Sequence, residues 1–178
     1  MQLDVWQHGA RPHGGLVRLR DRVMPCALGK NGVTLEGREG DGATPAGTYP
    51  LRRVMYRGDK VARPVTSLET NPIGPLDGWC DDSNDAAYNR PVRLPYPSSA
   101  ERLTRKDHLY DTIVVLGHND APVVPDLGSA IFMHVARPDF GPTLGCIALD
   151  PHDLRFVLQH MGRHSTIAIH ANRPGDHR

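Results

Sequence analysis

The 178-residue sequence lacks the cysteine and histidine patterns that mark a disulfide framework, a redox pair or a zinc site. Its three cysteines are an odd number and form no C-x-x-C motif, which argues against a complete set of disulfides and against a thiol redox protein. Ten histidines are present, but no H-E-x-x-H motif occurs among them. We therefore expect no metal site and no other cofactor.

Long apolar runs and blocks of like charge are also missing. No run approaches the ~18 apolar residues of a membrane span, and the N-terminus has no apolar stretch of signal-peptide length. Lys and Arg number 21 against 20 Asp and Glu, for a net charge of +1. We predict no membrane span and no visible export signal in the chain as given, and we do not expect nucleic acid to be the main partner.

Glycine and proline are abundant and lie between short apolar runs. Gly 18 and Pro 16 of 178 residues make about 19 %, against ~12 % in average usage. This pattern predicts a mainly β protein, and the length suits a single domain over residues 1–178. The expected strands cover 16–19, 23–28, 32–35, 48–54, 112–119, 130–136 and 165–171.

Two further segments stand out from this strand pattern. Residues from about 64 to 110 are rich in Pro, Asp, Asn and Ser, which predicts a long irregular loop region. One short helix is expected at about 151–161, with Asp150 as N-cap, an apolar i, i+3, i+4, i+7 stripe and Gly162 at its end. The polar tail beyond residue 171 is expected to fray.

The three cysteines differ in their surroundings. Cys26 lies in the apolar run V-M-P-C-A-L, where burial raises the pKa of a thiol, so it is expected to be a small core residue. Cys80 precedes Asp81 and Asp82, whose negative charge disfavours a thiolate. Cys146 has neither disadvantage.

The segment around Cys146 offers parts of a cysteine/histidine site. Gly145 permits a close backbone approach, and the N–H groups of Gly145 and Cys146 are suited to holding an oxyanion. Thr143 adds a hydroxyl, and His134, twelve positions earlier at the end of an apolar strand, is a suitable base. A buried structural cysteine and a hydrogen-bonded core histidine remain open alternatives.

The stretch 130-AIFMHVARPDFGPTLGCIAL-149 resembles the catalytic segment of the L,D-transpeptidases with the YkuD-type fold. The family motif has a histidine after an apolar strand and then Ser/Thr-x-Gly-Cys with an aliphatic residue, which matches His134, Thr143, Gly145, Cys146 and Ile147. The stretch 41-DGATPAGTYPL-51 resembles the family's T-P-x-G-x-[FY] strand. The resemblance predicts a YkuD-like catalytic core at about 15–171.

This resemblance implies a β-sandwich enzyme that acts on the peptide stems of peptidoglycan. Cys146 would be the nucleophile that forms a thioester, His134 the base, and the backbone carbonyl of Val135 the group that orients the histidine. An amine from a second stem would resolve the thioester and form a crosslink. The resemblance also implies a place in the periplasm or cell envelope and acylation by carbapenem-type inhibitors.

The sequence departs from the family motif at two positions. Leu144 stands where a second histidine is usual, and Ala148 where an arginine able to bind a substrate carboxylate is usual. We therefore expect an atypical, Arg-less subgroup with altered bond choice, using L-Ala as the acyl donor in a 1-3 crosslink. Other residues expected near the substrate, beside Thr143, are His118, Asn119, Arg137 and Tyr88.

Two other functions fit the same residues. A cysteine L,D-carboxypeptidase or endopeptidase would use the same thioester and resolve it with water. A wall-binding domain that keeps the fold would hold Cys146 in an unreactive state.

Overall fold

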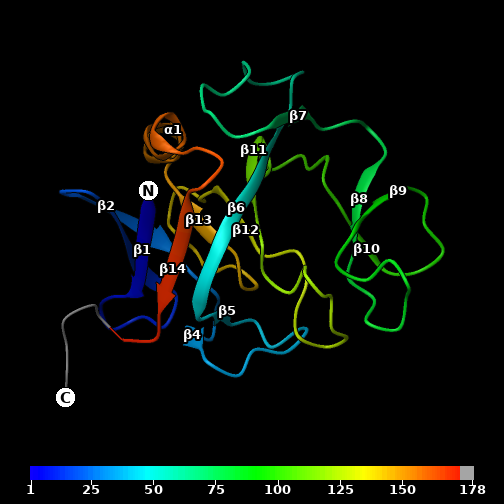
Figure 1. Ribbon diagram of the computed structural model, residues 1–178, viewed down its shortest axis with the longest axis horizontal. Coiled ribbons are helices and arrows are strands. Elements are labelled where there is room, and N and C mark those ends of the chain that lie inside the picture. The colour runs from blue at the N-terminus through cyan, green and yellow to red at the C-terminus, as the bar shows by residue number, and fades with distance from the viewer. Residues whose placement is uncertain (173–178) are drawn as a thin grey trace.

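Short apolar runs between glycines and prolines form strands throughout the computed structural model, which describes residues 1–172 (Figure 1). This confirms the mainly β prediction, with one helix in the described part of the chain. The elements are β1 Gln2–Gln7, β2 Gly14–Leu19, β3 Arg22–Ala27, β4 Val33–Thr34, β5 Thr44–Pro45, β6 Gly47–Tyr56, β7 Thr70–Pro72, β8 Asp77–Cys80, β9 Pro91–Arg93, β10 Ala100–Arg102, β11 Thr112–Leu116, β12 Phe132–Val135, β13 Ile147–Leu149, α1 Pro151–His160 and β14 Thr166–His170.

The main sheet closes on itself. Its nine strands follow the order β11-β12-β13-β3-β2-β1-β14-β6-β7, and β6 also pairs with β11. Eight strands therefore form a ring, and β7 is attached to β6 in parallel. The first and last strands, β1 and β14, pair in parallel side by side (Figure 1).

Alternation along the strands gives the sheet two apolar faces. In β12 and β13, Met133, Ile147 and Leu149 belong to the core inside the ring, together with the buried residues of α1. Phe132 and Cys146 belong to a second cluster, on the opposite face. Because successive side chains of a strand point to opposite faces, the Cys146 side chain lies on the outer face of the ring.

The excursion, residues 64–110, covers this outer face. Trp79, Leu103 and Tyr110 from the excursion pack against Ile113 and Phe132 of the main sheet. The excursion was predicted to be irregular, but it contains β7 and a small three-stranded sheet of order β10-β8-β9 (Figure 1, green, at the right). These strands have only three or four residues, too few for an alternating pattern to show in the sequence.

The helix α1 begins as predicted and ends differently. The Asp150 side chain accepts a hydrogen bond of 2.8 Å from the backbone N–H of His152, and Asp150 is the N-cap. The helix ends because Met161 is extended, at φ −94° and ψ 145°, so Gly162 is not its left-handed cap. Within the described residues no helix is long and apolar enough to cross a membrane.

Two predictions concern the ends of the chain. No strand was expected before residue 15, yet β1 places Leu3 and Val5 in the central core. Its alternating pattern L-D-V-W was present in the sequence, but it is short and is followed by polar turn residues. The tail beyond residue 171 was predicted to fray. Its residues from 173 on lie outside the described part of the chain.

Candidate active site

The register of two parallel strands brings Cys146 and His134 to one face. In β12 and β13, Met133 pairs with Ile147 and His134 with Ala148. Cys146 immediately precedes β13 and lies beside Phe132, whose backbone N–H donates a 3.3 Å hydrogen bond to the cysteine Sγ. His134 is two residues further along the same face. Both side chains line one cavity of about 580 Å³.

The Cys146 thiol is held in a buried, uncharged form. Its residue is 8 % exposed, and Sγ donates a 3.3 Å hydrogen bond to the carbonyl of Ala130. Burial raises the pKa of the Cys146 thiol to about 12, and the negative charge of Glu101 adds to the rise. A thiolate at Cys146 therefore requires a change in its surroundings, such as a bound substrate and a base.

His134 is buried as well and is oriented by its own strand. Its Nδ1 lies 2.8 Å from the carbonyl oxygen of Val135, the contact that the orienting role of Val135 requires. Because a carbonyl only accepts, Nδ1 carries the proton and Nε2 is left as an acceptor. The residue is 5 % exposed, and burial lowers the pKa of the His134 imidazole to about 4. The resting pair is thus a neutral thiol and a neutral imidazole.

The other two cysteines have surroundings that suppress reactivity, as the sequence predicted. All three cysteines are free and buried. Burial raises the pKa of the Cys26 thiol well above its ordinary value. Burial also raises the pKa of Cys80, and the charges of Asp85 and Asp81 raise it further.

A tight turn precedes Cys146. The Thr143 hydroxyl donates to the carbonyl of Cys146 at 2.7 Å and accepts from the N–H of Gly145 at 3.2 Å. The N–H of Gly145, predicted to hold an oxyanion, is therefore already engaged by Thr143. Gly145 has φ +136°, and a Cβ there would lie 2.8 Å from the carbonyl oxygen of Ala43.

The turn before Cys146 is hydrogen-bonded to the segment that follows β3, and that segment is bonded in turn to the T-P-A-G segment. The N–H of Thr143 donates to the carbonyl of Leu28 at 2.9 Å, and the N–H of Lys30 donates to the carbonyl of Thr143 at 3.0 Å. The N–H of Gly29 donates to the buried hydroxyl of Thr44 at 2.8 Å. The turn is thus held between two segments that lie about a hundred residues earlier in the chain.

Four of the predicted substrate residues line the cavity with Cys146. They are Thr143, Leu144, Ala148 and Arg137. Leu144 is 80 % exposed, whereas Ala148 is buried beside Phe140. The Arg137 guanidinium donates to the carbonyl of Pro142 at 3.2 Å. The position where the sequence comparison expected an arginine therefore holds a small, buried apolar side chain.

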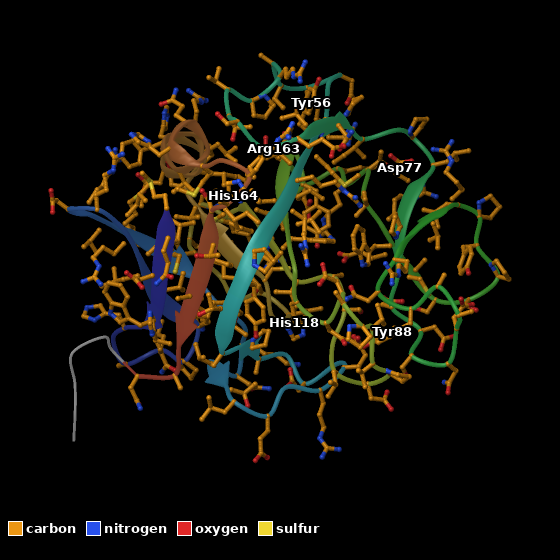
Figure 2. All side chains as sticks on the ribbon, viewed as in Figure 1. Tyr56, Asp77, Tyr88, His118, Arg163 and His164 are labelled. Atoms are coloured by element: carbon orange, nitrogen blue, oxygen red, sulfur yellow. The ribbon has the colours of Figure 1, made fainter. Side chains whose placement is uncertain are left out.

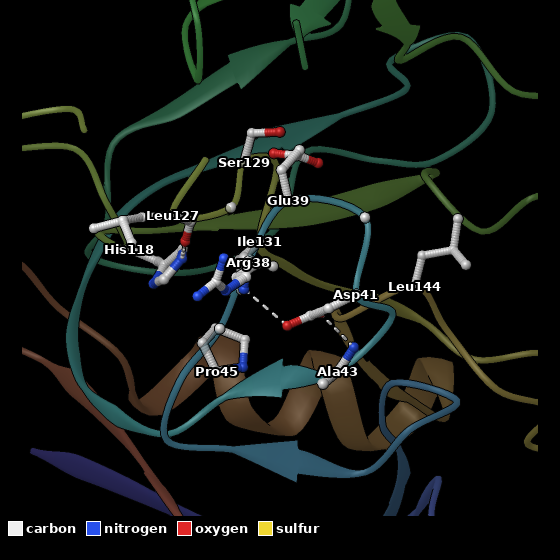
Figure 3. Close-up of a pocket in the computed structure, with 13 residues that line it drawn as sticks. Arg38, Glu39, Asp41, Ala43, Pro45, His118, Leu127, Ser129, Ile131 and Leu144 are labelled. Carbon is white, nitrogen blue, oxygen red and sulfur yellow. Dashed lines mark hydrogen bonds between the residues drawn. The ribbon is translucent and has the colours of Figure 1, made fainter. Parts of the chain in front are cut away.

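The other three predicted substrate residues lie outside this cavity. His118 lines an adjoining pocket of about 20 Å³, which shares Ser129 and Leu144 with the larger cavity. In this pocket the His118 side chain lies beside Leu127 and away from Leu144 (Figure 3). Its Nε2 is 2.9 Å from the Leu127 carbonyl. The Asn119 side chain donates to the carbonyls of Val124 and Gly128 and closes a loop. These two residues hold the chain that leads into β12.

Tyr88 is buried in the excursion (Figure 2). Its hydroxyl donates to the carboxylate of Glu39 and accepts the N–H of Gly128 at 3.0 Å. Next to it, Asn89 accepts from the Trp79 indole N–H and the Ala130 N–H, and it donates to the loop after β11. The two side chains attach the excursion to the segment that carries the Cys146 hydrogen-bond acceptor.

Several cavity residues were not predicted. Glu101 and Tyr110 come from the excursion, with Tyr110 donating to Glu101 at 2.7 Å. The Tyr110 ring meets the His134 ring edge-on, with centroids 5.3 Å apart. Glu39, Asp81 and Ser129 also line the cavity. They come from segments far apart in the chain, so no local motif could have joined them.

Comparison with known proteins identifies the family of this chain. The family model of the L,D-transpeptidase catalytic domain (YkuD) matches residues 14–169. The chain belongs to this family. Among solved structures, an L,D-transpeptidase from Mycobacterium smegmatis is similar at 16 % identity and a TM-score of 0.41, over 90 % of this chain and 55 % of that one. The chain thus spans about half of that protein. No curated protein sequence matches.

The family is one of L,D-transpeptidase catalytic domains, and it is generally associated with the cell envelope. No group of three His, Cys, Asp or Glu side chains in the described part of the chain is arranged to hold a metal.

Proposed function

We propose that this family member is a cysteine L,D-transpeptidase that acts on peptidoglycan stem peptides in the cell envelope, on the periplasmic side. One observation supports this most directly. Cys146 and His134 lie on one face of adjacent strands and open into the same cavity, with the histidine oriented by the Val135 carbonyl. Nucleophile, base and orienting group are the three parts that a thioester mechanism requires.

In the first step, Cys146 attacks the carbonyl carbon of an L,D peptide bond. Sγ leaves its hydrogen bond to Ala130, and its proton passes to Nε2 of His134 as the carbon–sulfur bond forms. The N–H of Cys146 stabilises the oxyanion, with that of Gly145 if Thr143 yields it. The carbon–nitrogen bond then breaks, the leaving amine takes the proton from His134, and a thioester remains.

In the second step, an amine of another stem attacks the thioester carbonyl. A new carbon–nitrogen bond forms and the carbon–sulfur bond breaks. The amine proton passes through His134 to the departing sulfur, which restores the neutral thiol. Water in place of the amine would give a carboxypeptidase or endopeptidase from the same intermediate. The ratio of crosslinked to hydrolysed product measures which reaction dominates.

The choice of acyl donor follows from the cavity wall. Ala148 offers no guanidinium to hold a carboxylate, and it places a small, buried apolar side chain in the same cavity wall as Cys146. We infer that the donor is L-Ala, the small first residue of the stem, which gives 1-3 crosslinks. Mass spectrometry of muropeptides after incubation with sacculi tests this. Crosslinks from the third stem residue alone would contradict it.

The nucleophile itself is tested by intact-mass measurement after incubation with a carbapenem. We expect a single adduct on the parent protein and on Cys80→Ala, and none on Cys146→Ala. Cys80 is a matched control because it is also a buried, free cysteine. An adduct that survives in Cys146→Ala would refute Cys146 as the nucleophile. A parent protein that remains unmodified by both carbapenem and stem peptide would favour the wall-binding alternative.

A further inference from the structure

The base His134 needs a fixed ring orientation, and its own strand supplies only part of what fixes it. Among the described residues its imidazole has one hydrogen bond, 2.8 Å from Nδ1 to the carbonyl oxygen of Val135. The torsion that turns a histidine ring is broad and roughly two-fold. Half a turn would put carbon atoms in the places of both nitrogens, and Nε2 could no longer take the proton of Cys146. Catalysis therefore needs a second group that holds the ring.

Tyr110, the last residue of the excursion, packs against this imidazole. Its ring meets the His134 ring edge-on, with centroids 5.3 Å apart and an interplanar angle of 67°. It also meets the ring of Phe132, whose backbone N–H bonds to the Cys146 sulfur, at 6.0 Å and 83°. Tyr110 is only 6 % exposed and lines the cavity that contains both members of the pair. One aromatic side chain thus contacts the base and the residue beside the nucleophile.

The backbone before Tyr110 is fixed to the same end of β12. The N–H of Val135 donates a 3.1 Å hydrogen bond to the carbonyl of Leu109. Val135 is also the residue whose carbonyl orients His134. Residues 109–110 therefore support the base twice. The backbone holds the residue that accepts from Nδ1, and the tyrosine ring packs on the imidazole itself.

The Tyr110 side chain is anchored by two residues that precede it in the excursion. Its hydroxyl donates to the carboxylate of Glu101 at 2.7 Å. The Arg105 guanidinium lies over its ring, 5.0 Å from the centroid. Arg105 is itself held by a two-bond pair with Asp107 at 2.9 and 2.6 Å. Because its hydroxyl, face and edge all have partners, the Tyr110 ring is held in one position and can hold the imidazole in turn.

Resting on the function proposed above, we propose that Tyr110 is a positioning residue for the base His134. Its ring keeps the imidazole in the orientation in which Nδ1 faces the Val135 carbonyl and Nε2 is free to take the proton of Cys146. The aromatic ring performs this role, and the hydroxyl serves to anchor the ring on Glu101. The excursion thus helps to build the reacting pair, in addition to covering the outer face of the sheet.

Two substitutions separate the ring of Tyr110 from its hydroxyl. Tyr110→Leu removes the ring, and Tyr110→Phe keeps it. We expect a carbapenem to acylate Cys146 about a hundredfold more slowly in Tyr110→Leu, and within about threefold of the parent rate in Tyr110→Phe. The loss should appear in the rate at saturating carbapenem and leave the half-saturating concentration unchanged, because the substitution misplaces the base and removes no contact that holds the ligand.

Tyr96→Leu is the matched control. Tyr96 also belongs to the excursion, and its hydroxyl donates to a carboxylate, that of Asp85, at 2.9 Å. It does not line the cavity that contains Cys146, so Tyr96→Leu should be acylated at the parent rate. Urea denaturation verifies that each variant is folded. If Tyr110→Leu does not fold, Tyr110→Met replaces it, because the flexible methionine side chain fills irregular space without an aromatic ring.

The state of the imidazole is measured directly by NMR of the histidine side-chain nitrogens, with the His134 signals identified by their absence from His134→Gln. We expect a single tautomer, protonated at Nδ1, in the parent, Tyr110→Phe and Tyr96→Leu, and an average of both tautomers in Tyr110→Leu. Parent-like acylation or a single tautomer in Tyr110→Leu overturns the positioning role, and so does an equal loss in Tyr110→Phe or in Tyr96→Leu. A parent protein that is not acylated would instead refute the proposed function.

Discussion

Replacing Gly145 with alanine should disturb the turn before Cys146 in two ways. At φ +136° the backbone is in a region that residues with a Cβ rarely adopt, which costs about 1–3 kcal/mol. The new Cβ would also lie 2.8 Å from the Ala43 carbonyl oxygen and 3.2 Å from Ile131 Cδ1. Because a carbonyl in a braced segment cannot easily move, the overlap costs about 1–3 kcal/mol more.

The net destabilisation is smaller than this sum, because alanine also lowers the conformational entropy of the unfolded chain. This stabilises the folded protein by about 0.4–1 kcal/mol. We therefore expect Gly145→Ala to lower the free energy of unfolding by about 3 kcal/mol. Gly9→Ala is the matched control, because Gly9 has φ +86° and no neighbouring atom within 4 Å of the added Cβ. It retains the backbone strain and lacks the overlap.

Urea denaturation of the two variants measures the difference, and carbapenem acylation measures the site. Gly145→Ala should be about 2 kcal/mol less stable than Gly9→Ala, and it should acylate far more slowly even where it is fully folded. Gly9→Ala should acylate at the parent rate. Equal stabilities, or a Gly145→Ala protein that acylates at the parent rate, would refute the reasoning that close contact with Ala43 fixes the turn.

Three further predictions follow from the same surroundings. The pKa of His134 in the folded protein, about 4, is below its ordinary value of 6.5. The neutral imidazole therefore makes its full contribution to the free energy of unfolding above pH 6.5, and this contribution is lost as the pH falls towards 4. When the pH is lowered from 7 to 4.5, the free energy of unfolding, measured by urea denaturation, should fall by about 2 kcal/mol less in His134→Gln than in the parent. The buried thiols, with raised pKa values, should resist iodoacetamide at pH 8 and react in urea. Mass spectrometry counts the adducts, and fast alkylation of folded Cys146 would contradict a neutral resting thiol. Asn89→Ala should cost about 3 kcal/mol by denaturation and slow acylation, because it removes four hydrogen bonds, one buried and three partly buried. Asn84→Ala, in an exposed local turn, should change stability by less than about 0.5 kcal/mol.

The parts of the site that could be predicted are those encoded within a short stretch of chain. Cys146 and His134 are twelve positions apart, and the strand pattern around each one fixes which face its side chain takes. The setting of Cys26 and Cys80 was equally local, because apolar neighbours or adjacent aspartates are visible in the sequence. Local pattern therefore sufficed to distinguish the three thiols.

The parts that could not be predicted depend on contacts between distant segments. Glu101 and Ser129 meet at one cavity only because the excursion folds back over β12. His118 and Asn119 were expected near the substrate because they follow a buried strand, but their side chains are used by the loop that connects β11 to β12. Polar residues at a strand end serve either purpose, and the sequence alone does not distinguish the two.

The parallel pairing of β1 with β14 has a consequence for the order in which the protein folds during synthesis. The hairpin of β2 and β3 can form early, and β1 can join it as soon as residues 2–27 have left the ribosome. The other edge of β1 has to wait for residues 166–170, the last strand among the described residues. Until then β1 presents an open edge with the apolar side chains of Leu3 and Val5, which exposes the nascent chain to aggregation. Closing the ring is therefore a late, long-range event, which predicts slow folding for a domain of this size.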